Sequence, residues 1–208
     1  PCRLSTGKQW VLPASKSHLI RWIALASQSR GAMRIKHVGE LGEDSIHMIR
    51  GLESLGAEIQ ISDGMISVSA KSGTFPCAPE KCIDIGNSGT GCRFMLALAS
   101  SMGSVSEITG DISLRSRPFE VITGALADLG CSVSRTEGGG LVVSGPAVPG
   151  KVALDLSKGS QPLSSLLIAA PSMGVNIEVE IQGEPVSQRY LELTYAICKL
   201  TGSENEFS

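Results

Sequence analysis

Apolar residues recur at helical spacing in six stretches of the chain, and these stretches form three pairs. A short run of alternating apolar and polar residues separates the two members of each pair, which is typical of a β-strand. The pattern therefore predicts helices over 17–27, 44–55, 91–102, 119–129, 162–170 and 189–200, and strands over 33–37, 106–109 and 176–181.

The ends of the predicted helices repeat as well. A glycine follows the second helix of each pair, at Gly56, Gly130 and Gly202, where a left-handed residue commonly ends a helix. After the first two of these glycines, alternating strands flank a short turn, Asp63-Gly64 in one case and 138–140 in the other. Both segments are predicted hairpins, and the sequence ends before a third hairpin.

This repeated order divides the chain into three similar units, at about 12–76, 77–150 and 151–208, with the last one truncated. Helices and strands mix within every unit, so the expected fold class is α/β (α+β). The chain has 208 residues, enough for one large domain. We therefore expect a single lobe made of three pseudo-repeats, the third incomplete.

Composition and charge narrow the possible functions. The chain is 42% hydrophobic and 4% aromatic and has a formal net charge of −2, which does not favour a nucleic-acid binder. No apolar stretch approaches the ~18 residues of a membrane span. Six cysteines and three histidines are scattered without the spacing of a metal site or a disulfide framework. We expect reduced thiols, a cytoplasmic location, and no metal or other cofactor.

Small hydroxyl and amide residues gather with cations just before three of the predicted helices, at 15–21, 86–93 and 158–161. A helix N-terminus exposes unpaired N–H groups and the positive end of the helix dipole, so it favours anions. Lys16 and Arg21 add a point charge and a bidentate fork suited to phosphate or carboxylate. Each cluster alone is also typical of a helix cap or a turn with solvated cations. Their recurrence in one register of a repeat predicts a shared anion site.

Two more clusters precede predicted helices. Arg115 and Arg117 lie just before Pro118, which is expected to begin a helix. Hydroxyl and amide residues at 187–190 introduce the last helix in the same way. The alternative for both is a solvated loop.

Taken in order, these clusters resemble the motifs of one known family. The chain reads Pro-x-Ser-Lys-Ser-x-x-x-Arg from 13, Gly-Asn-x-Gly-Thr-x-x-Arg from 86, Gly-Asp-x-x-Leu-x-x-Arg-Pro from 110, and Ser-Gln-x-x-x-x-Leu-Leu-x-x-Ala-Pro from 160. This series resembles the 5-enolpyruvylshikimate-3-phosphate (EPSP) synthases, also called 3-phosphoshikimate 1-carboxyvinyltransferases. The resemblance implies the enolpyruvyl transferase fold, in which each of two lobes contains three βαβαββ units.

The resemblance also implies a reaction. An enolpyruvyl group passes from phosphoenolpyruvate to the 5-hydroxyl of shikimate 3-phosphate, and phosphate is released, in the shikimate pathway of aromatic amino-acid biosynthesis. The implied mechanism is addition–elimination through a tetrahedral intermediate without a cofactor. Since both substrates carry phosphate and carboxylate groups, several cations and N–H donors are needed to bind them. No nucleic acid or membrane is an expected partner.

The motifs carry the family's site residues onto this chain. Two of them, Lys16 and Gln161, are implied to take part in catalysis. The residues implied to bind shikimate 3-phosphate are Lys16, Ser17, Arg21, Ser160, Gln161, Ser187 and Tyr190. Those implied to bind phosphoenolpyruvate are Lys16, Asn87, Gly89, Thr90, Arg117 and Gln161. Asp44 and Arg93 are weaker candidates for the same site.

The chain departs from the family pattern at three positions. Gly159 replaces a serine before Ser160, Phe94 replaces a proline, and Ser88 replaces a small aliphatic residue. These changes would alter the shape of the site and its sensitivity to glyphosate, the family's inhibitor, although Gly89 leaves room for that inhibitor. The family's second lobe has no counterpart here, so we expect the isolated chain to lack turnover.

Two alternatives stay open at this point. A UDP-N-acetylglucosamine enolpyruvyl transferase would share the fold and the donor, but its reactive loop cysteine has no clear match in Cys77 or Cys82. A non-catalytic anion-binding module of the same fold is the other alternative. An assay with each acceptor would distinguish the two transferases. Calorimetry with shikimate 3-phosphate would test the non-catalytic alternative, which predicts no binding.

Overall fold

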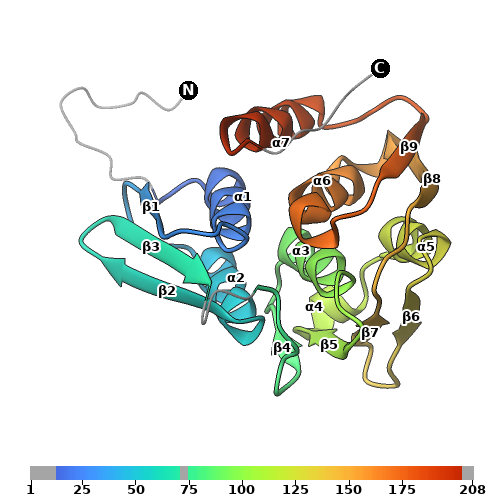
Figure 1. Ribbon diagram of the computed structural model, residues 1–208, viewed down its shortest axis with the longest axis horizontal. Helices are drawn as coiled ribbons and strands as arrows, with labels where there is room; N and C mark the ends of the chain where they lie inside the picture. The colour runs from blue at the N-terminus through green and yellow to red at the C-terminus, as the bar shows by residue number, and fades with distance from the viewer. Residues whose placement is uncertain (1–12, 71–74, 203–208) are drawn as a thin grey trace, which may run out of the picture.

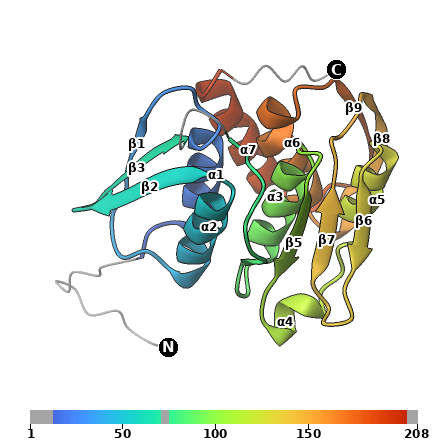
Figure 2. The same cartoon turned by 60° about the horizontal axis from the view of Figure 1, so that its bottom comes forward.

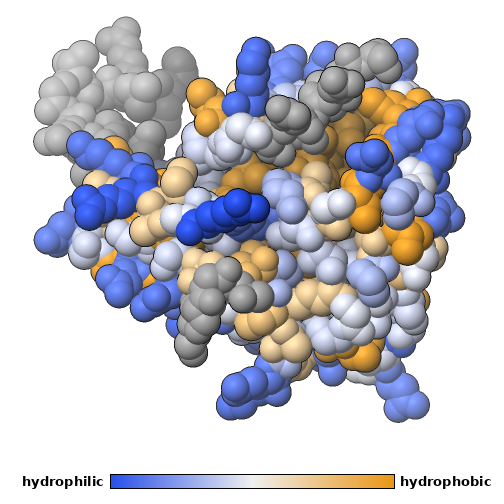
Figure 3. Space-filling view, in the orientation of Figure 1, coloured by the Kyte–Doolittle hydropathy of each residue, from blue (hydrophilic) through white to orange (hydrophobic). Residues whose placement is uncertain are grey.

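The computed structural model describes residues 13–70 and 75–202. Three β-sheets lie around the outside of the molecule, and a group of helices lies between them (Figures 1 and 2). On the face shown in Figure 3, the side chains that project farthest are mostly hydrophilic, and hydrophobic residues show between them in the upper middle and along the right-hand edge.

The first sheet has the strand order β1-β3-β2 and is antiparallel throughout. Its strands are β1 (Met33–Lys36), β2 (Ala57–Ser62) and β3 (Met65–Ala70). The predicted Asp63-Gly64 turn joins β2 to β3, and both turn residues have positive φ, as the favoured two-residue hairpin turn requires. The predicted strand and hairpin in this unit are confirmed.

The second sheet has the order β4-β5-β7-β6. It consists of β4 (Ile83–Asp84), β5 (Val105–Thr109), β6 (Ser132–Arg135) and β7 (Leu141–Ser144). β4 runs parallel to β5, and the other neighbours are antiparallel. The β5-β7-β6 part therefore has the same order and directions as β1-β3-β2.

The third sheet pairs β8 (Gly150–Asp155) with β9 (Ile177–Gln182) in parallel, as β4 pairs with β5. The hydrophobic pattern predicted β9 but neither β4 nor β8. The second sheet thus shares its antiparallel part with the first sheet and its parallel pair with the third. A threefold repeat would produce such partial matches, and the division into three units stays our interpretation.

Six helices supply the layer between the sheets, and their presence confirms the sequence pattern. They are α1 (Lys16–Ala26), α2 (Glu43–Ser54), α3 (Gly89–Ala99), α5 (Glu120–Asp128), α6 (Gln161–Met173) and α7 (Gln188–Leu200). α3 is the most completely buried, with almost every residue inside the protein, and it packs on α6. Their buried aliphatic and small side chains join one continuous core.

The predicted glycine stops lie where a helix-ending residue is needed. Gly56, Gly130 and Gly202 follow α2, α5 and α7 and have φ values of 94°, 81° and 76°. A residue with a Cβ is strained in this left-handed region, so glycine fits the position best. The C-cap interpretation of the three glycines is confirmed.

Some element boundaries were predicted wrongly. The segment before Pro118, for which no helix was predicted, contains a one-turn helix, α4 (Ile112–Arg115), capped by the Asp111 carboxylate, which accepts from Leu114 N at 2.7 Å. Pro118 does not begin α5: Phe119 is its N-cap and Glu120 its first residue. α3 begins at Gly89, two residues earlier than expected, because the Ser88 hydroxyl accepts from Gly91 N at 3.2 Å.

α6 continues through Pro171, although the sequence predicts a stop at 170. A proline inside a helix removes one N–H donor, which leaves a carbonyl one turn earlier without its usual partner. That carbonyl belongs to Leu167, and Cys198 Sγ donates to it at 4.0 Å. The Gln28 side chain holds the neighbouring backbone groups, because its Nε2 donates to Ile168 O at 2.8 Å and its Oε1 accepts from Ser172 N at 3.1 Å. The helix ends at Gly174, which has a left-handed φ of 61°.

Candidate active site

A cavity of about 870 Å³ lies where the N-terminal ends of five helices meet. These helices are α1, α3, α5, α6 and α7, and the residues just before three of them also line the cavity. Five cationic side chains and only two acidic ones face it, although the whole chain carries a net charge of −2. Positive charge and unpaired N–H groups are therefore concentrated here, as an anion site requires.

Most of the predicted site residues line this cavity. Ten of them do so: Lys16, Ser17, Arg21, Thr90, Arg93, Arg117, Ser160, Gln161, Ser187 and Tyr190. The other three contact residues of the lining: Asp44 pairs with Lys16, Asn87 accepts a hydrogen bond from Arg117, and Gly89 accepts one from Arg93. The prediction that Lys16, Arg21, Arg117 and Gln161 share one pocket is confirmed, and their roles toward a ligand stay predictions.

Lys16 is the first residue of α1, and its ammonium lies 2.5 Å from the Asp44 carboxylate at the start of α2. Its side chain is 46% exposed, so the ion pair is accessible to solvent and contributes little to stability. Ser15 occupies the N-cap position of α1, but its hydroxyl bonds the His18 ring at 3.0 Å and does not cap the helix. Ser17 is the second residue of the helix and lies inside it.

Arg21 is the most deeply buried cation of the site, at 2% exposure. Its guanidinium donates to Thr194 Oγ1 at 2.8 Å, to Ser17 O at 2.8 Å, and to Ser164 Oγ at 3.4 Å. The rings of Phe94 and Tyr190 lie within 6 Å of it. Burial lowers the pKa of Arg21 to about 10, because the charged form has lost most of its hydration.

Arg93 lies in the first turns of α3, and its fork reaches three separate segments. Nη1 donates to Gly89 O and to Gln161 Oε1, each at 2.9 Å, and Nη2 donates to Pro118 O at 2.8 Å. The Phe119 ring centroid is 4.6 Å from the guanidinium carbon. Burial lowers the pKa of Arg93 as well.

Arg117 follows α4 and reaches the glycine-rich segment before α3, where its Nη2 bonds Asn87 Oδ1. A Cβ added to Gly89 would lie 2.7 Å from Arg117 Nη1, so a glycine is needed for this close approach. The backbone that carries Arg117 is fixed from the other side by Arg135, which donates to Arg115 O at 2.6 Å and to Arg117 O at 3.2 Å. The geometry of the Arg117 side chain is thus set by a folded loop.

Ser187, before α7, has φ 60° and ψ 36°, a left-handed conformation that is uncommon for serine. Such positions often lie at functional sites, where the surrounding structure enforces them. Tyr190 is 48% exposed, so its ring forms part of the wall and remains open to solvent.

The prediction of the site omitted three charged residues that line the cavity, Glu120, Asp155 and Lys158. Lys158 belongs to the 158–161 cluster and could have been found from it. Asp155 caps the short 3₁₀ helix η2 (Leu156–Lys158), and hydrogen bonds from Ser157 hold the pKa of its carboxyl below the usual value. Glu120 carries no signal other than its place in the first turn of α5.

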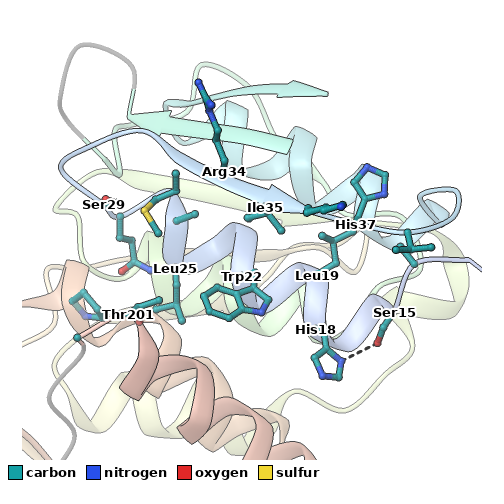
Figure 4. Close-up of a pocket in the computed structure, with 18 of the residues that line it drawn as sticks. Ser15, His18, Leu19, Trp22, Leu25, Ser29, Arg34, Ile35, His37 and Thr201 are labelled. Carbon is teal, nitrogen blue, oxygen red and sulfur yellow. Dashed lines mark hydrogen bonds between the residues drawn. The ribbon is translucent and has the colours of Figure 1, made fainter. Parts of the chain in front are cut away.

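A second cavity, of about 1100 Å³, lies between another face of α1 and strand β1 (Figure 4). His18, Leu19, Trp22 and Leu25 line it from α1, and Ile35 and His37 come from β1 and the residues after it. None of the predicted site residues lines it. The chemistry expected from the sequence motifs therefore belongs to the smaller and more cationic cavity.

The described ranges 13–70 and 75–202 contain no helix long and apolar enough to cross a bilayer. They also contain no group of three or more His, Cys, Asp or Glu residues placed to hold a metal ion. The five described cysteines are free thiols, and burial raises the pKa of Cys92 to about 12 and of Cys198 to about 11.

Comparison with known proteins places these features in a family. The family model described as EPSP synthase (3-phosphoshikimate 1-carboxyvinyltransferase) matches residues 8–205. Curated relatives named 3-phosphoshikimate 1-carboxyvinyltransferase include one from Methanococcoides burtonii, 36% identical over 195 residues, and one from Methanoculleus marisnigri, 34% identical over 197 residues. These alignments cover 92% and 93% of this chain, but only 45% and 46% of the relatives.

Solved structures agree with the sequence relatives. An EPSP synthase from Acinetobacter baumannii aligns with a TM-score of 0.67 at 27% identity, covering 78% of this chain and 38% of that one. The chain thus spans less than half the length of these proteins.

Proposed function

This chain belongs to the EPSP synthase family, and on that premise we propose that it is one of two lobes and supplies part of an enolpyruvyl transfer site. The proposed reaction moves the enolpyruvyl group of phosphoenolpyruvate to shikimate 3-phosphate. One observation carries the proposal: five helix N-termini and five cationic side chains converge on one cavity of about 870 Å³. Both substrates carry a phosphate and a carboxylate, which are the groups that such a cavity would hold.

The shikimate 3-phosphate part of the site is proposed to lie between α1, α6 and α7. Arg21 would bring a full positive charge, because its bonds to Thr194, Ser164 and Ser17 go to neutral oxygens that leave the charge uncancelled. The remaining proposed contacts are hydroxyl, amide and ammonium groups of the same three helix starts, from Lys16, Ser17, Ser160, Gln161, Ser187 and Tyr190.

The phosphoenolpyruvate part is proposed to lie at the N-terminus of α3. Arg117 would pair with the phosphate or carboxylate, and its contacts with Asn87 and Gly89 hold its fork there before a substrate binds. Thr90 and the free N–H groups of the first turn of α3 would add uncharged donors. Lys16 and Gln161 would face both substrates, which is where charge develops as the tetrahedral centre forms.

The activity of the whole enzyme would need a second lobe, since the relatives are about twice as long as this chain. The cavity is accordingly proposed to be half of a site that closes between two lobes. We propose a cytoplasmic location, in keeping with free thiols at the described cysteines.

Calorimetry with the purified chain tests the proposal. We expect it to bind shikimate 3-phosphate and, more weakly, phosphoenolpyruvate and inorganic phosphate, and to bind shikimate without its phosphate far less. Arg34→Met is a matched control, because this exposed arginine lies at the other cavity and its loss should leave binding unchanged. A folded chain that takes up shikimate 3-phosphate no better than shikimate would overturn the proposal.

Turnover is a separate test. Phosphate release from phosphoenolpyruvate should be absent with the chain alone, whether shikimate 3-phosphate or UDP-N-acetylglucosamine is the acceptor. Steady release with either acceptor would contradict the need for a second lobe, and the productive acceptor would identify the reaction.

A further inference from the structure

Arg93 connects three segments that meet at the cavity but are far apart in the sequence. Its Nη1 contacts the carbonyl of Gly89 and the side-chain oxygen of Gln161, which is 68 positions away. Its Nη2 contacts the carbonyl of Pro118, directly after Arg117. One planar group therefore fixes the glycine-rich segment, the arginine loop and the start of α6 relative to each other.

Most donors of Arg93 are used within the protein. The two Nη groups make three hydrogen bonds, Nε is buried without a partner among the described residues, and the Phe119 ring covers the guanidinium at 4.6 Å. In contrast, Arg117 has one hydrogen bond to a side chain in the described structure. Arg93 is thus poorly placed to act as a ligand contact and well placed to hold other groups.

The contact with Gln161 determines which way its carboxamide faces. A guanidinium has only donors, so the carboxamide must present its oxygen to Arg93 and its NH₂ group away from it. Oxygen and nitrogen of a glutamine amide are otherwise hard to tell apart, and the hydrogen-bond partners decide between them. Because Gln161 is the first residue of α6 and lines the cavity, the NH₂ end is the one that a bound molecule meets.

We propose that Arg93 is a positioning residue that fixes the Gln161 carboxamide, so that Gln161 acts toward a bound anion as a hydrogen-bond donor and not as an acceptor. This inference rests on the proposed function for the identity of the anion, but the orientation itself does not depend on it. The preferred partner of Gln161 is then an unprotonated oxygen that accepts a hydrogen bond, as in the phosphate and carboxylate groups of the two substrates.

Why this position needs arginine follows from the same geometry. The three acceptors are spread around one plane, and a planar fork reaches them together, whereas a lysine ammonium is a single point with a hydration shell. Arg93→Lys keeps the charge but is expected to release the Gln161 oxygen. Gln161→Glu keeps the contact to Arg93 and replaces the donor end with a second carboxylate oxygen, which repels an anion.

A double-mutant cycle tests the coupling. The affinity for shikimate 3-phosphate is measured by calorimetry for the wild type, Arg93→Lys, Gln161→Ala and the double variant. Each single change should weaken binding on the order of tenfold, which is typical when a hydrogen bond to a charged group is lost. The double variant should be within about twofold of Gln161→Ala, because Arg93 acts through Gln161. If the loss of affinity in the double variant equals the product of the two single losses, the proposal is overturned.

A ligand-free measurement separates this inference from the proposed function. In ¹⁵N–¹H spectra, the Gln161 side-chain NH₂ is assigned by its loss in Gln161→Ala. In the wild type, the chemical shifts of this NH₂ group should differ from those of a free glutamine side chain. In Arg93→Lys, they should move to the values of a free glutamine side chain. Arg34→Lys, the same substitution at an exposed position, should leave it unchanged. If the NH₂ signal does not respond to Arg93→Lys, the proposal fails, even in a chain that binds shikimate 3-phosphate. If it responds but the wild type binds no anion, only the proposed function fails.

Discussion

Arg21 is a buried charge that the fold holds at a cost, and replacing it with methionine should separate stability from binding. The side chain is 2% exposed, and all its hydrogen bonds go to neutral oxygens. No ion pair joins it to a carboxylate in the described residues. Arg21→Met removes the charge and keeps a shorter unbranched side chain, which adapts well to irregular space in a core.

The structure allows the size of the effect to be worked out. Burial lowers the pKa of Arg21 from its ordinary value above 12 to about 10, which corresponds to a penalty of about 3 kcal/mol for the charged form. Since the folded state holds the proton less tightly than the unfolded state, the penalty is present at every pH below about 10. Its hydroxyl partners keep each other satisfied without it, because Ser164 bonds Thr194 at 2.9 Å and Thr194 donates to Tyr190 O at 2.7 Å.

We therefore expect Arg21→Met to raise the free energy of unfolding by about 1–3 kcal/mol at pH 7, after allowing for the hydrogen bonds lost. The same variant should bind shikimate 3-phosphate about 10- to 100-fold more weakly, because a charge-assisted contact is gone. Urea unfolding, followed by far-UV circular dichroism, and calorimetry measure the two effects. Arg34→Met, at an exposed cation, should change neither quantity appreciably.

A fall of more than about 1 kcal/mol in the unfolding free energy of Arg21→Met, at an unchanged dependence on urea, would refute this reasoning. It would mean that the hydrogen bonds of the guanidinium outweigh its desolvation, and that Arg21 stabilises the fold.

Three further changes give distinct expectations. Gly89→Ala should alter the unfolding free energy by less than about 1 kcal/mol, because the new Cβ meets the ends of two long side chains, Arg117 Nη1 at 2.7 Å and Arg93 Nη1 at 3.3 Å, and no backbone atom within that range. It should weaken phosphoenolpyruvate binding by calorimetry, and unchanged binding would contradict the role of Arg117. Gly110→Ala should lower the unfolding free energy by about 3 kcal/mol or more, because its Cβ would overlap the carbonyl oxygen of Gly86; a melting temperature near that of the wild type would count against this close packing. Burial raises the pKa of Cys92 to about 12, so the folded state holds the thiol proton more tightly than the unfolded state does. The resulting stabilisation is fully present below the unfolded thiol's pKa of ~8.5 and is lost as pH rises toward 12. Between pH 8 and pH 10 the free energy of unfolding, measured by denaturant titration, should fall by about 2 kcal/mol less in Cys92→Ala than in the wild type. An equal fall in the two proteins would show that folding does not change the pKa of this thiol.

The sequence predicted the elements whose signals are local. Helical spacing and the glycine stops depend on a few neighbouring residues, and Gly56 and Gly130 ended helices as expected. Elements held by distant partners were missed. β4 has only two residues and exists because it pairs with β5. The backbone of α6 around Pro171 is held by side chains far away in the sequence, such as Gln28, which donates to Ile168 O 140 positions away. No pattern within one stretch of sequence contains that information.

The same distinction applies to the site. The clusters at helix starts predicted that Lys16, Arg21, Arg117 and Gln161 would meet, since equivalent positions of a repeat come together. The contacts that orient these groups could not be predicted. The bond from Arg21 to Thr194 spans 173 positions, and it depends on how α7 packs beside α1.

The partners of the site's arginines leave their positive charge uncancelled. Arg21 is bound by hydroxyls and a carbonyl, Arg93 by carbonyls and a carboxamide, and Arg117 by a carboxamide. Neutral oxygens of this kind fix the direction of a guanidinium without cancelling its charge, whereas a carboxylate would do both. Of the five lining cations, Lys16 is the one paired with a carboxylate in the described structure, and it is also among the most exposed. Three hydrogen-bonded arginines and two exposed lysines thus give the cavity a positive potential, and a phosphate or carboxylate that enters would meet it already in place.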